Sequence, residues 1–158
     1  GLGMPEVTLP VVPGMEGCHW PFRKTGAEGW PRLLHLLLGG KPVKAGDALG
    51  WLVDYAGPLE DALKVAWKIV TDGDHGLTLR KVEEGALKGV PKEISGLTPG
   101  DEGTEAARKA ILNNVHSCCD AALAEALDIQ AKNSAGFMSG KHCQRGIIGS
   151  EFKKTMKI

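Results

Sequence analysis

Apolar and polar residues alternate near the start of the chain. Val7, Leu9 and Val11 alternate with Thr8 and Pro10, which is the two-residue period of a half-buried strand. Because proline lacks the N–H that a central strand needs, the pattern favours an edge strand or an irregular extension. The start of the chain is therefore predicted to be an extended segment that runs into a loop.

Helical spacing of apolar residues follows in four segments. The first spans Trp30 to Gly40, and a short one at residues 45–49 precedes a brief extended piece at residues 51–55. A third helix opens after Pro58, where acidic residues come first and lysines follow, in keeping with the helix dipole. The longest pattern covers residues 104–138, and it is either one bent helix or two in succession.

Two of these segments carry long apolar stripes. After Pro58 the stripe consists of Leu59, Leu63, Ala66, Trp67 and Val70, with charged residues on the opposite face. In the longest segment, which Thr104 is expected to cap, the stripe consists of Ala107, Ile111, Val115, Cys119, Leu123, Leu127 and Ala131. We expect the part of this second stripe from Ala107 to Leu127 to suit packing between subunits. Glycine and proline crowd residues 85–103, which are predicted to form a long surface loop.

The amino-acid composition limits the kinds of molecule that the protein is expected to bind. The 158 residues are enough for one self-sufficient core. Lysine plus arginine and aspartate plus glutamate each total 19, so the net charge is zero and no basic face supports nucleic-acid binding. The longest apolar run, Leu33 to Leu38, contains His35 and is too short to span a bilayer, and no charged leader precedes it. We expect a soluble, cytoplasmic protein with neither nucleic-acid nor membrane partners.

The cysteines do not predict a disulfide framework or a metal site. Cys118 and Cys119 are adjacent, and neither they nor Cys18 and Cys143 fall into the spacing of a zinc ligand set. The four residues are therefore predicted to be buried, inert thiols, with no metal bound.

Glu6 is the single charged residue among the first fifteen, and apolar residues and prolines surround it. Such surroundings favour the neutral form of a carboxyl group, which is how proteins make general acids and bases that work near neutral pH. Two interpretations stand on the residues alone: Glu6 is either exposed on an extended segment or an acid/base residue.

Several stretches resemble the enoyl-CoA hydratase/isomerase (crotonase) superfamily, and they come in that family's order. Met4–Gly14 is similar to its "PE-[VI]-x-L-G-x-x-P-G" stretch, and Leu36–Leu49 to its "LLLTGRPISAEEAL" turn and helix. The further matching stretches are Gly50–Asp54, Pro58–Leu63, Leu123–Gln130 and Phe137–Lys141, with Gly146.

The resemblance implies an α/β, crotonase-like (ClpP/crotonase) fold, of which this chain holds mainly the helical C-terminal portion with two or three short strands. Residues 1–103 would finish the spiral core with its following helices and loop, and residues 104–158 would form a helical oligomerisation region. The chain starts inside the family pattern, after the family's oxyanion-hole loops and its other catalytic glutamate. An assay with crotonyl-CoA is therefore expected to show no turnover by the 158-residue chain alone.

The resemblance also assigns roles to the start of the chain. Glu6 falls on the family's acid/base glutamate, and Pro13 and Gly14 fall on the loop that closes over the acyl group. Two departures stand out, since Pro10 occupies a position where glycine is usual and Glu16 replaces a glycine of that loop. Glu16 is either a second catalytic acid that repels Glu6 or a residue that points to solvent.

Partners follow from the same resemblance. Lys153 and Lys154 lie in the family's C-terminal helix region, where they either approach the phosphates of coenzyme A bound to a neighbouring subunit or are solvated. The expected substrate is an acyl-CoA, with no cofactor beyond the coenzyme A it contains, and the expected assembly is a homotrimer or hexamer. The alternative is a non-catalytic oligomerisation module. The sequence leaves hydration, isomerisation, C–C hydrolysis and decarboxylation open.

Overall fold

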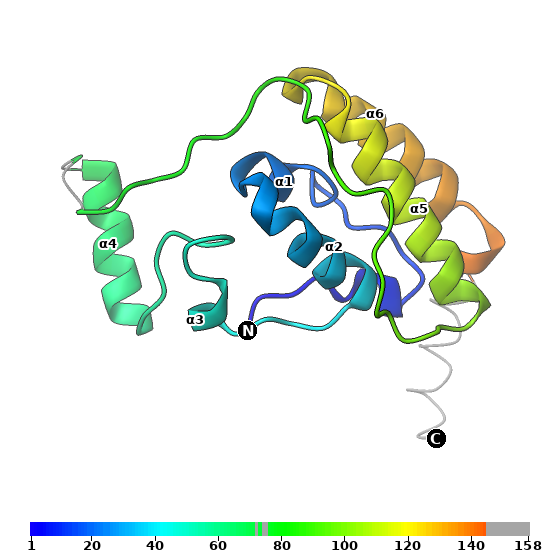
Figure 1. Ribbon diagram of the computed structural model, residues 1–158, viewed down its shortest axis with the longest axis horizontal. Coiled ribbons are helices and arrows are strands. Elements are labelled where there is room, and N and C mark those ends of the chain that lie inside the picture. The colour runs from blue at the N-terminus through cyan, green and yellow to red at the C-terminus, as the bar shows by residue number, and fades with distance from the viewer. Residues whose placement is uncertain (72, 74–75, 145–158) are drawn as a thin grey trace.

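The computed structural model describes residues 1–71, 73 and 76–144 and consists mostly of helices (Figure 1). The elements in chain order are the 3-10 turn η1 (Pro5–Thr8), α1 (Trp20–Lys24), the 3-10 turn η2 (Ala27–Gly29), α2 (Trp30–Gly39), α3 (Ala45–Ala48), α4 (Leu59–Thr71), α5 (Glu102–Cys119) and α6 (Leu123–Met138). The helices α5 and α6 lie side by side as a hairpin, with α1 and α2 packed beside them.

Helix α2 confirms the prediction for its segment. A proline stands in its first turn, where a missing N–H costs nothing, and Gly40 ends it in the left-handed conformation with φ 65°. The N–H of Gly40 bonds to the carbonyl of Leu36 at 3.1 Å. A Cβ at position 40 would lie 2.7 Å from Thr8, so glycine also lets η1 pack closely against this end of the helix.

The longest helical pattern forms two helices. Asp101, rather than the expected Thr104, caps α5: its Oδ1 accepts the Thr104 N–H at 2.7 Å. The prediction of Thr104 as the cap was wrong because the helix begins three residues earlier than that cap implies, at Glu102, after a residue with an equally good capping oxygen. The helix pair separates at residues 120–122, without a proline or a glycine.

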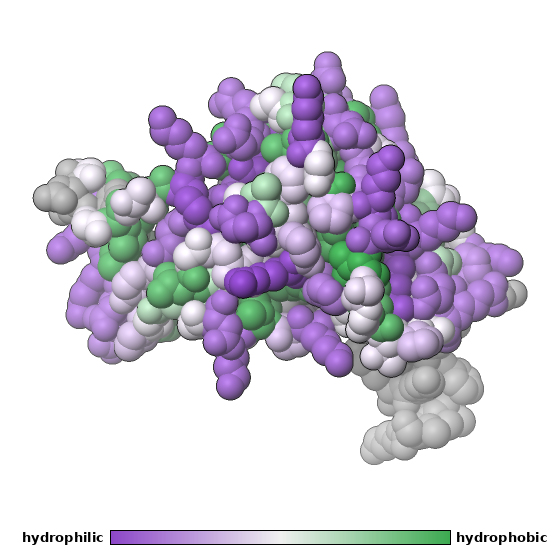
Figure 2. Space-filling view, viewed as in Figure 1, coloured by the Kyte–Doolittle hydropathy of each residue, from purple (hydrophilic) through white to green (hydrophobic). Residues whose placement is uncertain are grey.

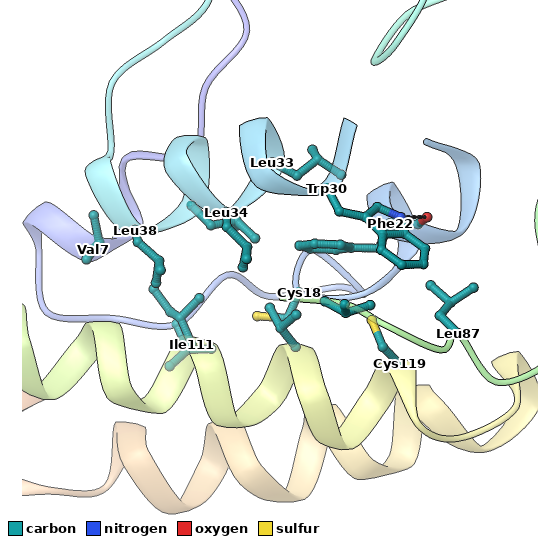
Figure 3. Packing of buried hydrophobic residues seen from close by; sticks show 14 of the residues in the cluster. Val7, Cys18, Phe22, Trp30, Leu33, Leu34, Leu38, Leu87, Ile111 and Cys119 are labelled. Carbon is teal, nitrogen blue, oxygen red and sulfur yellow. Dashed lines mark hydrogen bonds between the residues drawn. The ribbon is translucent and has the colours of Figure 1, made fainter. Parts of the chain in front are cut away.

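The core lies between α2 and α5 (Figure 3). Leu34 and Leu38 of α2 point toward Ile111 of α5, with Phe22 and Cys18 beside them. Ala107, Ile111, Val115 and Cys119 are fully buried there. The expectation that their stripe packs between subunits is wrong for these four, because they fill the chain's own core.

The extended segment predicted at the start is a 3-10 turn. Val7 is buried but Leu9 is about half exposed, so the alternating residues do not share one face, as a strand would require. Thr8 donates its hydroxyl to the Pro5 carbonyl at 2.7 Å, and the Glu6 carbonyl accepts the Leu9 N–H at 3.0 Å. Hydrogen bonds within the turn form instead of strand pairing, because no partner strand runs alongside this segment within the described residues.

Helix α4 confirms the predicted start after Pro58, and its apolar stripe is exposed. Leu59, Leu63, Trp67 and Val70 are 75%, 61%, 70% and 82% exposed. The helix stands apart from the other helices in Figure 1, and hydrophobic atoms lie at the surface over it in Figure 2. Its apolar face is therefore available to something other than the described part of the chain.

β-structure in the described ranges is limited to two isolated bridges, Leu2 with Val43 and Leu49 with Val53. The extended piece predicted at residues 51–55 is a turn that contains one of these bridges. Residues 77–101 return from α4 to α5 without helix or strand, in agreement with the predicted loop. The crotonase-like fold and the division at residue 103 stay predictions.

Candidate functional site

Glu6 lies on η1 with part of its carboxylate inside the protein. Its Oε2 is buried and has no hydrogen-bond partner among the described residues. Burial raises the pKa of the neighbouring Cys18 thiol far above its ordinary value, and Cys118 and the Glu6 carboxylate raise it further. One carboxylate oxygen of Glu6 is thus shielded from water without a donor among the described residues, and the acid/base role of Glu6 stays a prediction.

A buried glutamine holds the loop that follows Glu6. Gln130 of α6 is 2% exposed, and its Nε2 donates to the Pro13 carbonyl at 2.8 Å. Its Oε1 accepts the Cys18 N–H at 3.2 Å, so one amide spans both ends of the loop. Sequence reasoning assigned Gln130 no role. The available signal was an amide four residues after Ala126 on the buried side of a helix, where a polar group needs a partner.

The other predicted site residues occupy different surroundings. Pro13 is buried and offers its carbonyl to Gln130, whereas Gly14 is exposed. Glu16 is partly exposed, has a positive φ of 66°, and lies close enough to His19 to act on its charge. The Glu16 carbonyl accepts the N–H groups of His19 at 3.0 Å and of Trp20 at 2.9 Å, whereas its carboxylate forms no ion pair with a described residue. Lys153 and Lys154 lie outside the described residues.

A buried arginine, Arg23, joins the segments that lie around the loop after Glu6. Arg23 of α1 is 1% exposed, and its guanidinium donates to four backbone carbonyls. The acceptors are Glu83 at 3.1 Å, Gly85 at 2.7 Å, Cys118 at 2.8 Å and Ala121 at 2.8 Å. Two of these carbonyls close the end of α5, where the helix dipole favours a cation. One side chain thus joins α1, the loop after residue 82 and the turn between α5 and α6.

His19 completes the contacts of this arginine. Arg23 Nε donates to His19 Nδ1 at 3.3 Å, so the proton of the neutral ring belongs on Nε2. His19 Nε2 is buried, with no hydrogen-bond partner in the described part of the chain. Burial lowers the pKa of His19 below 6.5 and Arg23 lowers it further, whereas Glu16 opposes the change.

The lowered pKa of His19 predicts that acid destabilises the fold. Below about pH 6.5 the unfolded state binds a proton at His19 that the folded state resists, so the free energy of unfolding falls as the pH falls. Denaturant unfolding between pH 7.5 and 5 is expected to show this slope, at most one proton for this group, and His19→Gln is expected to flatten it. His35→Gln, at an exposed histidine of α2, is the control and should keep the slope.

Asp54 affects stability in a more acidic pH range than His19 does. Burial raises the pKa of this carboxyl, but hydrogen bonds from Arg80 and Lys24 outweigh burial and hold it below its usual value. Its contribution to stability is therefore present above about pH 4 and is lost in stronger acid.

The His19 prediction has a clear contrary outcome. If the dependence of unfolding free energy on pH between 7.5 and 5 is unchanged in His19→Gln, the role given to His19 is contradicted.

The comparisons with known proteins cover part of the chain. A stretch of 73 residues, 44% of this chain, is 40% identical to a peroxisomal bifunctional enzyme of Cavia porcellus. Part of this chain resembles an enzyme. The match spans 10% of the length of that protein. No protein-family model matches the chain, and no solved structure matches it.

The remaining chemistry of the described residues is limited. Their thiols are buried, as predicted, and burial raises the pKa of Cys118 to about 11 and that of Cys119 to about 12. In the same ranges no three His, Cys, Asp or Glu side chains come together in a way that could hold a metal ion. None of the described helices combines the length and apolar character that crossing a membrane requires.

Proposed function

We propose that this chain forms part of a site for enoyl-CoA thioester chemistry, in which water is added to an enoyl-CoA or its double bond is moved through an enolate. In this proposal Glu6 is the general acid/base that takes up and returns a proton. The observation that carries the proposal is its carboxylate oxygen Oε2, which is buried and has no hydrogen-bond partner in the part of the chain that the structure describes.

Four further observations support it. The residues around Glu6 match the family stretch that holds an acid/base glutamate, and 73 residues of the chain resemble an enzyme. The loop after Glu6 is fixed at Pro13 and Cys18 by Gln130, which limits its motion beside the reacting groups. Gly14, at the exposed middle of this loop, leaves room for an acyl chain because no atom lies within 4 Å of its missing Cβ.

The experiment is an assay of the natural protein that contains these 158 residues, with crotonyl-CoA as the substrate. Hydration is followed as loss of the absorbance of the conjugated thioester, and isomerisation is followed with the 3-enoyl isomer. Turnover that depends on Glu6 supports the proposal. Turnover that is unchanged in Glu6→Gln, or no turnover of either thioester, overturns it.

A second candidate function is self-assembly, and the exposed stripe of α4 favours it. We propose that two copies pair through Leu59, Leu63, Trp67 and Val70, in antiparallel orientation. Glu60 and Asp61 lie in the first turn of α4 and Lys68 in its last turn. Antiparallel pairing brings the acidic turn of each copy beside Lys68 of the other, so the charges complement each other.

Sedimentation tests this pairing. Leu63→Gln is expected to weaken self-association roughly a hundredfold, since a symmetric pair loses the burial of two leucines. Lys132→Gln, at an exposed lysine of α6, should leave association unchanged, as should Glu6→Gln. Lys68→Glu should weaken the pair, and adding Glu60→Lys should restore it. A wild-type chain that sediments as a monomer at high concentration would contradict the pairing.

A further inference from the structure

Helix α4 stands apart from the other helices, and hydrogen bonds hold the chain on both sides of it (Figure 1). None of its residues, 59–71, is buried. Ala62, Val65 and Ile69, which share one face of the helix, are half-buried. With so little packing along its length, the direction of the exposed stripe depends mainly on the contacts at the base of the helix.

A short turn fixes the chain before α4. The Ala48 carbonyl accepts the Leu52 N–H at 2.9 Å. Trp51 and Leu52 are partly buried and pack against the core, and Trp51 Nε1 donates to the Asp47 carbonyl at 2.7 Å. Asp54 therefore follows a turn that is itself attached to the rest of the protein.

The carboxylate of Asp54 binds a cation that follows α4 in the chain. Its Oδ1 accepts from Nε of Arg80 at 2.6 Å, and Nη1 of the same guanidinium donates to the Trp51 carbonyl. The Nζ atom of Lys24, the last residue of α1, lies 2.9 Å from Asp54 Oδ2. The Asp54 side chain is 12% exposed, so water screens these contacts less than it screens a surface ion pair. One carboxylate thus joins α1 to the chain on either side of α4.

The chain after Arg80 is held on α1 as well. The Glu83 N–H donates to the Arg23 carbonyl at 2.9 Å, and Arg23 Nη1 donates to the Glu83 carbonyl at 3.1 Å. Both connections of α4 are therefore bound to the end of α1, through Lys24 and through Arg23. Fixing both connections limits the directions that α4 can take.

We propose that the ion pair of Asp54 and Arg80 is a clasp that orients α4 for pairing with a second copy of the chain. This inference rests on the self-assembly proposed above for the stripe of α4. With the clasp closed, the stripe points in one direction, and pairing costs little further conformational entropy. With the clasp open, each copy must restrict the direction of its α4 when it pairs, so the affinity falls.

Sedimentation of the full chain measures the effect on pairing. Asp54→Asn keeps the size of the side chain but removes its charge, and it is expected to weaken self-association about tenfold. Arg80→Gln is expected to weaken it at least as much, since it also removes the donor to the Trp51 carbonyl. The double variant should match Arg80→Gln alone, because both substitutions break the same ion pair. Asp128→Asn, at an exposed aspartate of α6, is the matched control and should leave association unchanged.

NMR order parameters of the backbone, measured on the dilute monomer, test the clasp without relying on pairing. In the wild-type chain the order parameters of α4 are expected to equal those of α5. In Asp54→Asn they are expected to fall in α4, while the chemical shifts of α5 and α6 stay unchanged. The clasp lies outside the core between α2 and α5, so opening it should leave that core intact.

The two measurements separate a failure of this inference from a failure of the proposed pairing. A wild-type chain that stays monomeric at high concentration contradicts the pairing, and the inference with it. A wild-type chain that pairs, together with an Asp54→Asn variant that pairs as tightly or keeps its order in α4, overturns the clasp alone. Loss of order in α5 and α6 of Asp54→Asn would make Asp54 part of the core's support and would also overturn the clasp.

Discussion

Glu6→Gln is expected to lower kcat for enoyl-CoA hydration by about 10²–10⁴-fold, the usual contribution of a general acid/base. The amide has nearly the same shape as the carboxylate but cannot take up the proton. KM is expected to change little, because the substitution removes a group that acts on the reacting atoms and leaves the acyl pocket in place.

The stability of Glu6→Gln should change in the opposite direction from its activity. The Oε2 atom of Glu6 is buried without a hydrogen-bond partner among residues 1–71, 73 and 76–144, which destabilises the folded state. Glu6→Gln removes the charge, so the free energy of unfolding is expected to stay equal or to rise. Glu16→Gln, at a partly exposed carboxylate in the same loop, tests the open role of Glu16 as a second acid. A fall of both activity and stability in Glu6→Gln would indicate a structural role and would contradict the proposed function.

Arg23→Met is expected to destabilise the fold by roughly 3–5 kcal/mol, the largest effect on stability predicted for this chain. Methionine fills a similar volume but leaves the carbonyls of Gly85, Cys118 and Ala121 without their donor. An unsatisfied buried acceptor costs about 1–3 kcal/mol, and several are lost together. Denaturant unfolding measures the change, with circular dichroism to confirm that the variant starts folded.

Arg23→Lys separates the charge from the geometry. The ammonium group keeps the cation but presents its donors from one atom, so it cannot serve all four carbonyls that the two terminal nitrogens of the guanidinium reach. We expect a loss of roughly half that of Arg23→Met. Arg32→Met, at an exposed arginine, should cost less than about 1 kcal/mol. An equal, small effect in all three variants would mean that Arg23 does not hold the loop and the hairpin together.

The sequence predicted the helices well because the spacing of apolar residues agrees with the residues that start and end each helix. In α2 the leucines, the early proline and the final Gly40 all specify the same bounds, and packing confirms them. The turn between α5 and α6 carried no such signal. It exists because Leu123 N–H bonds to Glu84 and Cys119 accepts from Leu87, and bonds to a distant loop leave no local pattern.

The candidate site was predicted in part for the same reason. Glu6 could be singled out because a lone charge among apolar residues is visible in the sequence. Gln130 and Arg23 could not, since a glutamine or an arginine on a helix is usually solvated. Their importance comes from carbonyls that the fold brings to them from far along the chain. The strand predicted around Val7 failed because alternation alone does not supply a partner strand.

Gln130 and Arg23 bond to residues that are distant in the sequence, and this affects the folding rate. Helix-rich chains usually fold fast because their contacts are local. Here the Gln130 amide bonds to Cys18 across 112 positions, and Arg23 bonds to Ala121 across 98. Loops of that length must close before either bond forms, at an entropic cost that precedes the gain. We expect this chain to form its helices early but to reach the native state at the slower rate typical of proteins whose contacts are distant in sequence.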